Sequence, residues 1–253
     1  AKIAAWGRYS EDLFRSWGVE PEKIALTGVP RYDDFAAGDR EKARADAAAA
    51  TGWDGKGPLI AYACDPYHRE GREDYVGIPS SQREEREQLE CFLGGLAELQ
   101  KESAAFGVVK MHPKDGDEAW WRGIVKGHPA QERAAVLRLY SRRNLLRASD
   151  LLVTTYSTVA IEAMLLGIPV ITINLTGRKD LQPHAELGAA LPVRAPAEMA
   201  PAMRRALTDP ETRKSLENGQ RHALDYYMEY RDGKSSHRVA QLLNDLMEKK
   251  NVS

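Results

Sequence analysis

Short apolar runs alternate with longer amphipathic segments over most of the chain. From residue 58 onward the apolar runs have the length of buried strands, and the segments between them have the length of helices. Strands are expected at residues 59–63, 107–111, 151–155, 170–173 and 191–193. Helices are expected at residues 81–103, within 132–147, and at 158–166, 197–207, 210–230 and 235–249. This alternation predicts an α/β fold: a Rossmann-like, doubly wound parallel sheet with helices on both faces.

The segment before residue 58 has a different pattern. Residues 3–6 and 24–27 are strand-like, residues 10–17 helical, and the bend at residues 28–30 precedes an Ala-rich, charged helix that ends at Gly52. The chain has no initiator Met and begins directly in a strand-like segment. We therefore expect it to be a fragment of a longer protein.

Composition narrows the class of protein. The formal net charge is -1, so the basic excess of a nucleic-acid binder is missing. Two cysteines are too few for a disulfide framework and lack metal-ligand spacing, which favours a reducing, cytoplasmic setting. The most apolar run, residues 151–175, is interrupted by polar residues, glycine and proline, and no signal peptide is visible. We expect a cytoplasmic protein that binds neither nucleic acid nor a metal cofactor.

The most informative segment joins the strand at residues 151–155 to the helix that follows. Tyr156 marks a turn, and Ser157 or Thr158 begins the helix. Ligands of such sheets bind at the carboxyl ends of the strands, and a helix start there offers backbone N–H groups and the positive end of the helix dipole. With the two hydroxyls as further donors, this is a candidate diphosphate site. The alternative is that Ser157 or Thr158 only caps its own helix.

Glu162 is the only charged residue between Asp150 and Arg178. It comes four residues after Thr158 and so lies on the same face of the helix, one turn further on. Its spacing differs from that of a capping box. A carboxylate at this position can accept two hydrogen bonds from a ribose diol. The alternative is a solvated glutamate on the outer face of the helix.

A second candidate is His112, which follows a strand and precedes a proline. It is expected to face the same edge of the sheet, as a neutral donor or as a cation beside phosphate. Lys110 and Lys114 flank it, and lysines at a strand end are usually solvated. In the loop after residue 63, Arg69 is a candidate phosphate ligand and Tyr67 a candidate for stacking on a base, although a plain surface loop is the simpler interpretation.

Other motifs of nucleotide-binding and catalytic sites are missing. The sequence has no Gly-rich phosphate loop, no dinucleotide fingerprint, no nucleophile elbow and no Asp-x-Asp pair. From the residues alone we expect a domain that binds an anionic, nucleotide-like ligand.

At this point the sequence resembles the GT-B glycosyltransferases. The similarity is carried by residues 24–33, by the Lys110-Met111-His112-Pro113 segment, by the block from Asp150 to Pro169 and by residues 207–213 and 232–235. It is nearest to CDP-glycerol glycerophosphotransferases, capsule polysaccharide transferases and their relatives. The UDP-GlcNAc 2-epimerases share the plan, but they carry a Gly-Gly pair where this chain has Thr158-Val159, which counts against an epimerase.

The resemblance implies an organisation and a function. Residues 1–35 would be the end of an N-terminal domain and the crossing from it, and residues 36–253 the nucleotide-donor-binding domain. The function would be metal-independent transfer in surface polysaccharide or glycoconjugate synthesis, from a CDP-, CMP- or UDP-linked donor to a glycan or polyol acceptor.

It also implies roles for single residues. Ser157, Thr158 and the helix start would hold the donor diphosphate, Glu162 the ribose, and His112 would belong to the donor pocket. Most of the catalytic set would lie in the missing domain, as would any peripheral contact with a membrane, so the fragment is expected to be inactive alone. The alternatives are an epimerase-like enzyme and a nucleotide-binding module without catalysis.

Overall fold

A computed structural model describes residues 1–64, 82–113 and 115–251. Its internal contacts divide the chain into two compact units, one formed by residues 39–220 and the other by residues 1–38 together with 221–253. Helix α8, Pro210–Tyr227, carries residues of both units. The expected domain boundary between residues 35 and 36 stays a prediction. A division into compact units does not test which part of the chain folds alone.

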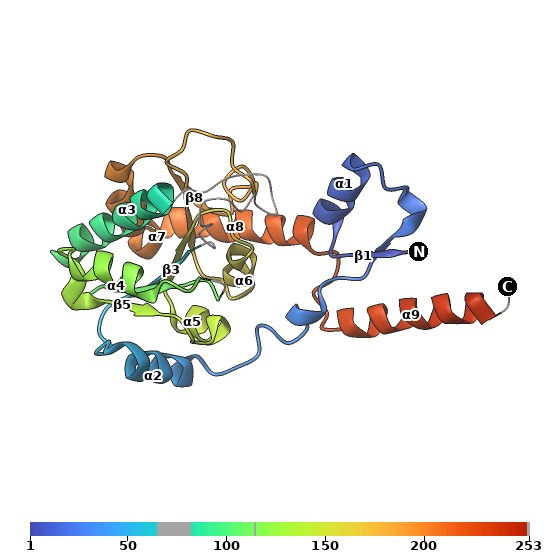
Figure 1. Ribbon diagram of the computed structural model, residues 1–253, viewed down its shortest axis with the longest axis horizontal. Coiled ribbons are helices and arrows are strands. Elements are labelled where there is room, and N and C mark those ends of the chain that lie inside the picture. Colours follow the sequence, from blue (N-terminus) through green and yellow to red (C-terminus); the bar gives the residue numbers. More distant parts are fainter. Residues whose placement is uncertain (65–81, 114, 252–253) are drawn as a thin grey trace. The chain divides into compact units, whose positions relative to one another are not determined.

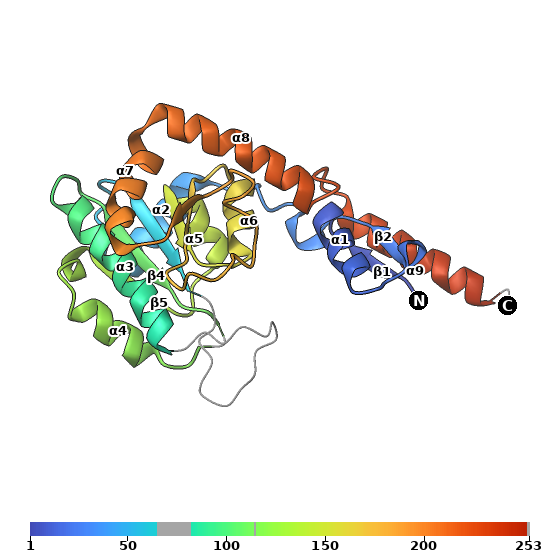
Figure 2. The ribbon, with the colours of Figure 1, turned by 90° about the horizontal axis from the view of Figure 1, so that it is seen from above.

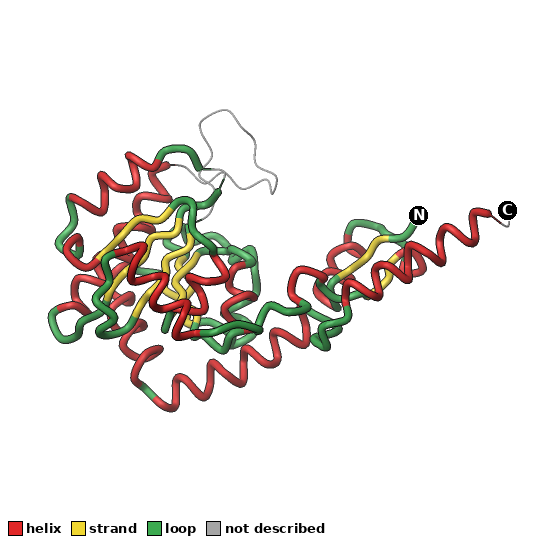
Figure 3. The backbone as a smooth tube through the Cα atoms, turned by 90° about the horizontal axis from the view of Figure 1, so that it is seen from below, coloured by secondary structure: helices red, strands yellow, loops and turns green. Residues whose placement is uncertain are grey.

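The larger unit is built on a six-stranded sheet with the order β5-β4-β3-β6-β7-β8, in which every neighbouring pair is parallel. Figure 3 shows these strands side by side, with helices around them. Their bounds are β3 Leu59–Ala63, β4 Phe106–Lys110, β5 Ala134–Leu137, β6 Leu151–Thr154, β7 Val170–Ile173 and β8 Leu191–Val193. The expected α/β class with a doubly wound parallel sheet is confirmed.

Helices cover both faces of this sheet (Figures 1 and 2). One group packs together and against β4 to β8: α3 Gln82–Gln100, α4 Glu118–Lys126 and α7 Met199–Thr208. The other group packs against β3, β5, β6 and β7 and contains α2 Arg40–Thr51, α5 Arg142–Ala148 and α6 Val159–Leu165. Because both faces are covered, the strands read as continuous apolar runs rather than as alternating ones.

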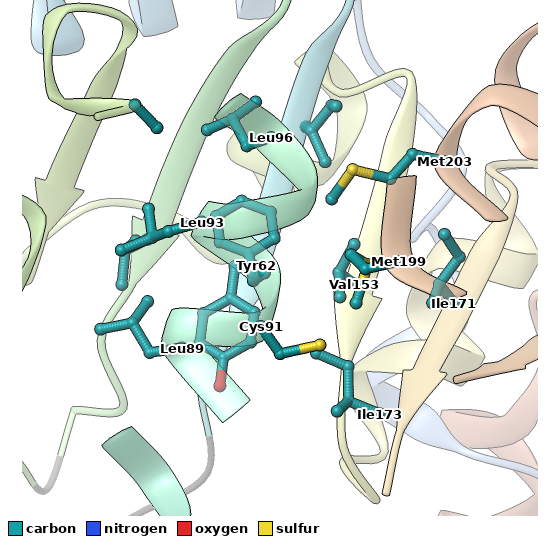
Figure 4. Packing of buried hydrophobic residues seen from close by; sticks show 14 of the residues in the cluster. Tyr62, Leu89, Cys91, Leu93, Leu96, Val153, Ile171, Ile173, Met199 and Met203 are labelled. Carbon is teal, nitrogen blue, oxygen red and sulfur yellow. The ribbon is translucent and has the colours of Figure 1, made fainter. Parts of the chain in front are cut away.

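The core under α3 follows from the spacing of its apolar residues. Leu89, Phe92, Leu93 and Leu96 recur at helical intervals, and all four are fully buried. Phe92 stacks on Tyr62 of β3 with ring centroids 5.0 Å apart. Figure 4 shows methionines of α7 packing into the same cluster. Each such side chain contributes about 1.5–3 kcal/mol through the hydrophobic effect, so this face holds the sheet rigid behind the loops at its edge.

Two elements differ from the expectation. The helix expected within residues 132–147 is present as α5, but a strand that was not expected, β5, precedes it. The run is only four residues long and starts with two alanines, which favour helix, so its strand character comes from pairing with β4 at the sheet edge. The pattern also misses α4, whose Trp121 is fully buried and donates a hydrogen bond to Asp115 (2.5 Å).

The smaller unit contains a parallel pair of strands, β1 Ile3–Ala5 and β2 Ile24–Leu26, with α1 Arg8–Ser16 between them in sequence. Helix α9, Ser235–Asn251, begins against the carboxylate of Asp33, which accepts hydrogen bonds from the backbone N–H groups of Ser235 (2.8 Å) and Ser236 (2.7 Å). A Cβ on Gly28, whose φ is +79°, would lie 2.4 Å from the hydroxyl oxygen of Ser235. Only glycine therefore allows β2 to lead into this capped helix start.

Three-residue 3-10 turns complete the described part of the chain. They are η1 Pro21–Lys23, η2 Pro30–Tyr32, η3 Gln131–Arg133 and η4 Pro196–Glu198. Within that part, none of the helices combines the length and the apolar character needed to cross a membrane.

Candidate functional site

The strand order reverses between β3 and β6, so the chain winds outward in opposite directions from this point. Ala63, the last residue of β3, pairs with Lys110 on one side and with Thr154 on the other. The loops that begin at residues 64, 111 and 155 therefore leave the sheet beside one another. In open α/β sheets this reversal point, at the carboxyl ends of the strands, is where ligands bind.

The end of β4 is organised by a buried lysine. Lys110 is 6% exposed, and its ammonium donates hydrogen bonds to the carbonyls of Met111 (2.7 Å) and Arg138 (2.8 Å). Burial lowers the pKa of Lys110, and the charge of Arg142 lowers it further. The expectation that this lysine is solvated is wrong, because the carbonyls that follow β4 and β5 converge on it. Lys114 lies outside the described residues.

His112 is half-buried at the same edge of the sheet. Its backbone N–H donates to the sulfur of Cys64 (3.1 Å), which ties the loop after β4 to the end of β3. The histidine therefore follows a strand end at the reversal point, as the sequence predicts.

Glu162 forms an ion pair with an arginine in this region. Its carboxylate is 1% exposed and accepts two hydrogen bonds from Arg142, one from Nε and one from Nη2, each 2.6 Å long. Arg142 begins α5, where Ser141 caps the helix by accepting a hydrogen bond from the N–H of Asn144 (3.2 Å). A solvated glutamate is therefore excluded. Sequence reasoning missed Arg142, although a lone acid in an apolar helix signals that some cation must meet it.

The first turn of α6 uses more of its own backbone N–H groups in internal hydrogen bonds than the sequence suggests. Thr158 is the N-cap residue, is exposed, and makes no capping hydrogen bond through its side chain. Ser157 is half-buried, and its hydroxyl accepts a long hydrogen bond from the N–H of Val159 (3.4 Å). The N–H groups of Ala160 and Ile161 donate to the carbonyls of residues 157 and 158 (3.1 Å each). At this helix start, the hydroxyls are thus better placed to meet a ligand than those two backbone amides.

A buried histidine is hydrogen-bonded to this turn. His184 is fully buried and hydrogen-bonds the backbone of Ser157. Burial lowers the pKa of His184 to about 4, so the ring is neutral at pH 7. Sequence reasoning missed this histidine, because it lies in an irregular segment outside the motifs that carry the other candidates.

Comparison with known proteins now adds the family. The family model of the CDP-Glycerol:Poly(glycerophosphate) glycerophosphotransferases matches residues 3–245. The chain belongs to this family. No curated protein matches the sequence.

Solved structures with a similar fold include two glycosyltransferases. The wall teichoic acid polymerase TagF is 17% identical with a TM-score of 0.67, and the match covers 100% of this chain and 59% of that one. Anabaena Alr3699/HepE in complex with UDP-glucose is 14% identical with a TM-score of 0.59, covering 96% of this chain and 64% of that one. The GT-B resemblance expected from the sequence is confirmed, and the chain spans less than two thirds of either relative.

Two predicted ligand residues of this glycerophosphotransferase family member remain to be placed. Tyr156 is half-buried and lines a small cavity at the ends of β6 and β7. Arg69, with Tyr67, lies outside the described residues.

A larger cavity, of about 310 Å³, lies at the opposite edge of the sheet, where β3, β6 and β7 begin. Arg40 and Arg44 line it, but both pair with Asp150 (2.7 and 3.0 Å), whose carboxylate also accepts the N–H of Leu59 (2.8 Å). These charges hold the sheet to α2. The carboxyl edge therefore stays the candidate ligand site of this family member.

Proposed function

We propose that this chain is the donor-binding part of a metal-independent glycosyl- or glycerophosphotransferase of surface polysaccharide or glycoconjugate synthesis, working in the cytoplasm. The family match over residues 3–245 supports this reading. A TagF variant has been solved after a soak with CDPG and HepE in complex with UDP-glucose, which supports a CDP- or UDP-linked donor. The acceptor, a glycan or polyol, would meet the donor with help from parts that this chain does not contain.

The observation that carries the proposal is the Arg142–Glu162 pair. A buried carboxylate holds a guanidinium whose side chain is 46% exposed, beside the first turn of α6 and at the reversal point of the sheet. Two of the five N–H donors of Arg142 serve Glu162, which leaves others for a phosphate. We propose that Arg142, with the hydroxyls of Ser157 and Thr158, binds the donor diphosphate, and that His112 lies beside it.

Glu162 has two roles in this proposal. It orients Arg142, and it accepts a hydrogen bond from a ribose hydroxyl, because each carboxylate oxygen can accept more than one hydrogen bond. To accept this hydrogen bond, Glu162 needs the ribose of the nucleotide to lie at the edge of the Arg142–Glu162 pair. Tyr156 and Arg69 complete the proposed set of donor ligands.

Calorimetric titration with CDP, UDP, CMP and UMP in the presence of EDTA tests the proposal. A diphosphate of at least one base should bind without added metal, and Arg142→Met should weaken it about tenfold or more, equivalent to about 1.4 kcal/mol. Arg40→Met is the matched control, since Arg40 also pairs with a carboxylate but at the opposite edge of the sheet. The affinity of the Arg40→Met variant for the diphosphate should stay within about twofold of wild type.

Two results would count against the proposal. Binding of none of the four nucleotides would remove the donor-binding function. Equal losses in Arg142→Met and Arg40→Met would show that the ligand does not use the carboxyl edge.

A further inference from the structure

The small cavity at the ends of β6 and β7 has a volume of about 50 Å³ and lies between these strands, α3 and residues 174–182. Four of the side chains that line it have a buried polar atom with no hydrogen-bond partner in the described part of the chain. They are Gln88 (Oε1), Thr155 (Oγ1), Thr172 (Oγ1) and Gln182 (Oε1).

Four unpartnered polar atoms around one cavity would lower the stability of the fold if nothing were bound there. Gln88, Thr155 and Thr172 are each only 5–6% exposed. A buried polar group without a partner costs about 1–3 kcal/mol, and native proteins contain few of them. Four around one cavity therefore indicate an occupant that supplies the missing hydrogen bonds.

The four atoms select the chemistry of that occupant. Threonine hydroxyls donate and accept, whereas the two amide oxygens only accept. An anion would bring further acceptors against these oxygens. Of the two cationic residues that line the cavity, Arg178 is paired with Glu84 (2.6 Å) and Lys179 is exposed to solvent. Neutral hydroxyl groups, which donate as well as accept hydrogen bonds, match these two threonine hydroxyls and two amide oxygens.

The size of the cavity limits the occupant further. A volume of about 50 Å³ has room for about three or four water-sized groups. A short hydroxylated chain fits this space, but a whole hexose ring does not. Water can fill it until ligand hydroxyls replace it, because ordered water makes nearly equivalent hydrogen bonds.

One wall of the cavity is already rigid. The side-chain amide of Asn174 donates to the carbonyl of Arg178 (2.8 Å) and to Asp180 (2.7 Å), and its oxygen accepts from the N–H (3.1 Å) and hydroxyl (2.7 Å) of Thr176. A ligand would therefore not have to order this wall on binding, which reduces the entropic cost.

We propose that Gln88, Thr155, Thr172 and Gln182 form a subsite that recognises neutral hydroxyl groups on the transferred part of the donor. This rests on the proposed function, because it places the phosphates at Arg142 and Ser157 and the hydroxylated group beyond them. Thr155 and Tyr156 line the cavity and directly precede Ser157, so the two parts of the ligand would occupy adjoining positions.

The test compares ligands that differ only in hydroxyl groups. CDP-glycerol and the propyl ester of CDP, which has the same three-carbon chain without hydroxyls, are titrated calorimetrically against the whole chain, with the uridine pair and free CDP and UDP in parallel. Wild type should bind the glycerol compound about tenfold more tightly than the propyl ester. Thr172→Val, which removes one hydroxyl at constant shape, should reduce this preference to about threefold or less and leave the affinity for the free diphosphate unchanged.

Thr154→Val is the matched control. Thr154 is also buried at the sheet edge, but its hydroxyl donates to the carbonyl of Ala63 (3.0 Å). Its preference between the two esters should equal that of wild type. Thermal unfolding adds a second readout: Thr154→Val should lower Tm, whereas Thr172→Val should leave Tm unchanged or raise it, because the hydroxyl it removes has no partner among the described residues.

The outcomes separate the two proposals. If a free diphosphate binds but wild type does not prefer the glycerol compound, or Thr172→Val keeps the preference, the subsite is refuted and the donor site stands. If Thr172→Val lowers Tm as much as Thr154→Val, the hydroxyl has a protein partner and the subsite is also refuted. If no diphosphate binds, both proposals are refuted.

Discussion

The pair of Arg142 and Glu162 allows a quantitative test of how the carboxyl edge is built. Arg142→Met leaves a carboxylate that is 1% exposed without its bidentate partner. Removing one member of a buried ion pair costs about 3–5 kcal/mol. Because the Arg142 side chain is 46% exposed, water can reach part of the vacated space, and we expect the lower end, about 3 kcal/mol. For a chain of this size that corresponds to a fall in Tm of about 6–12 °C.

A double-mutant cycle distinguishes the loss of the ion pair from a general loss of stability caused by either substitution. Glu162→Leu leaves a half-exposed guanidinium that water can solvate, so it should cost about 1 kcal/mol. In the double variant Arg142→Met/Glu162→Leu neither charge is left buried, and stability should return to within about 1 kcal/mol of wild type. The coupling energy should therefore be at least about 3 kcal/mol, measured by urea denaturation or differential scanning calorimetry.

Arg83→Met provides the matched control. Arg83 also pairs with a glutamate, Glu87, but the two side chains are 86% and 45% exposed. Its loss should leave the stability close to that of wild type, because water solvates both partners of an exposed pair. Equal costs for Arg142→Met and Arg83→Met, or additive effects in the cycle, would refute the view that Glu162 is a buried charge that depends on Arg142.

Three further outcomes are expected. Burial lowers the pKa of His184 to about 4 from its ordinary 6.5, so the unfolded state binds more protons between these values and stability should fall by about 3 kcal/mol as the pH drops through this window. Urea denaturation at a series of pH values should show this slope in wild type and a flatter curve in His184→Gln. Gly219→Ala should cost about 3 kcal/mol in the same assay, because the added Cβ would lie 2.1 Å from the carbonyl oxygen of Gly188; a neutral substitution would contradict the close packing of these backbones. Burial raises the pKa of Asp33, but hydrogen bonds from the start of α9 outweigh this and hold it below the ordinary 3.8. Its stabilising effect is therefore complete above that value and is lost as the pH falls through the lowered pKa. Asp33→Asn should accordingly lower Tm at pH 7 and have a progressively smaller effect as the pH falls below 3.8.

The sequence alone determined the class of fold and the edge of the sheet that carries the candidate site. The strands at residues 59–63 and 151–155 are visible because a strand buried on both faces must be apolar throughout, and this signal is local. His112, Ser157 and Thr158 follow such strands directly. Since parallel strands end at a common edge, their approximate location followed without coordinates.

Only the tertiary structure decided how the charges and cavities at that edge are arranged. Glu162 and Arg142 are twenty residues apart on different helices, so neither periodicity nor motif spacing relates them. Lys110 is buried because carbonyls after two strands converge on it, and β5 is a strand because β4 offers it a partner. The cavity between β6, β7 and α3 depends in the same way on side chains from distant segments. Local pattern determines which elements form, whereas packing determines which polar groups meet and which are left for a ligand.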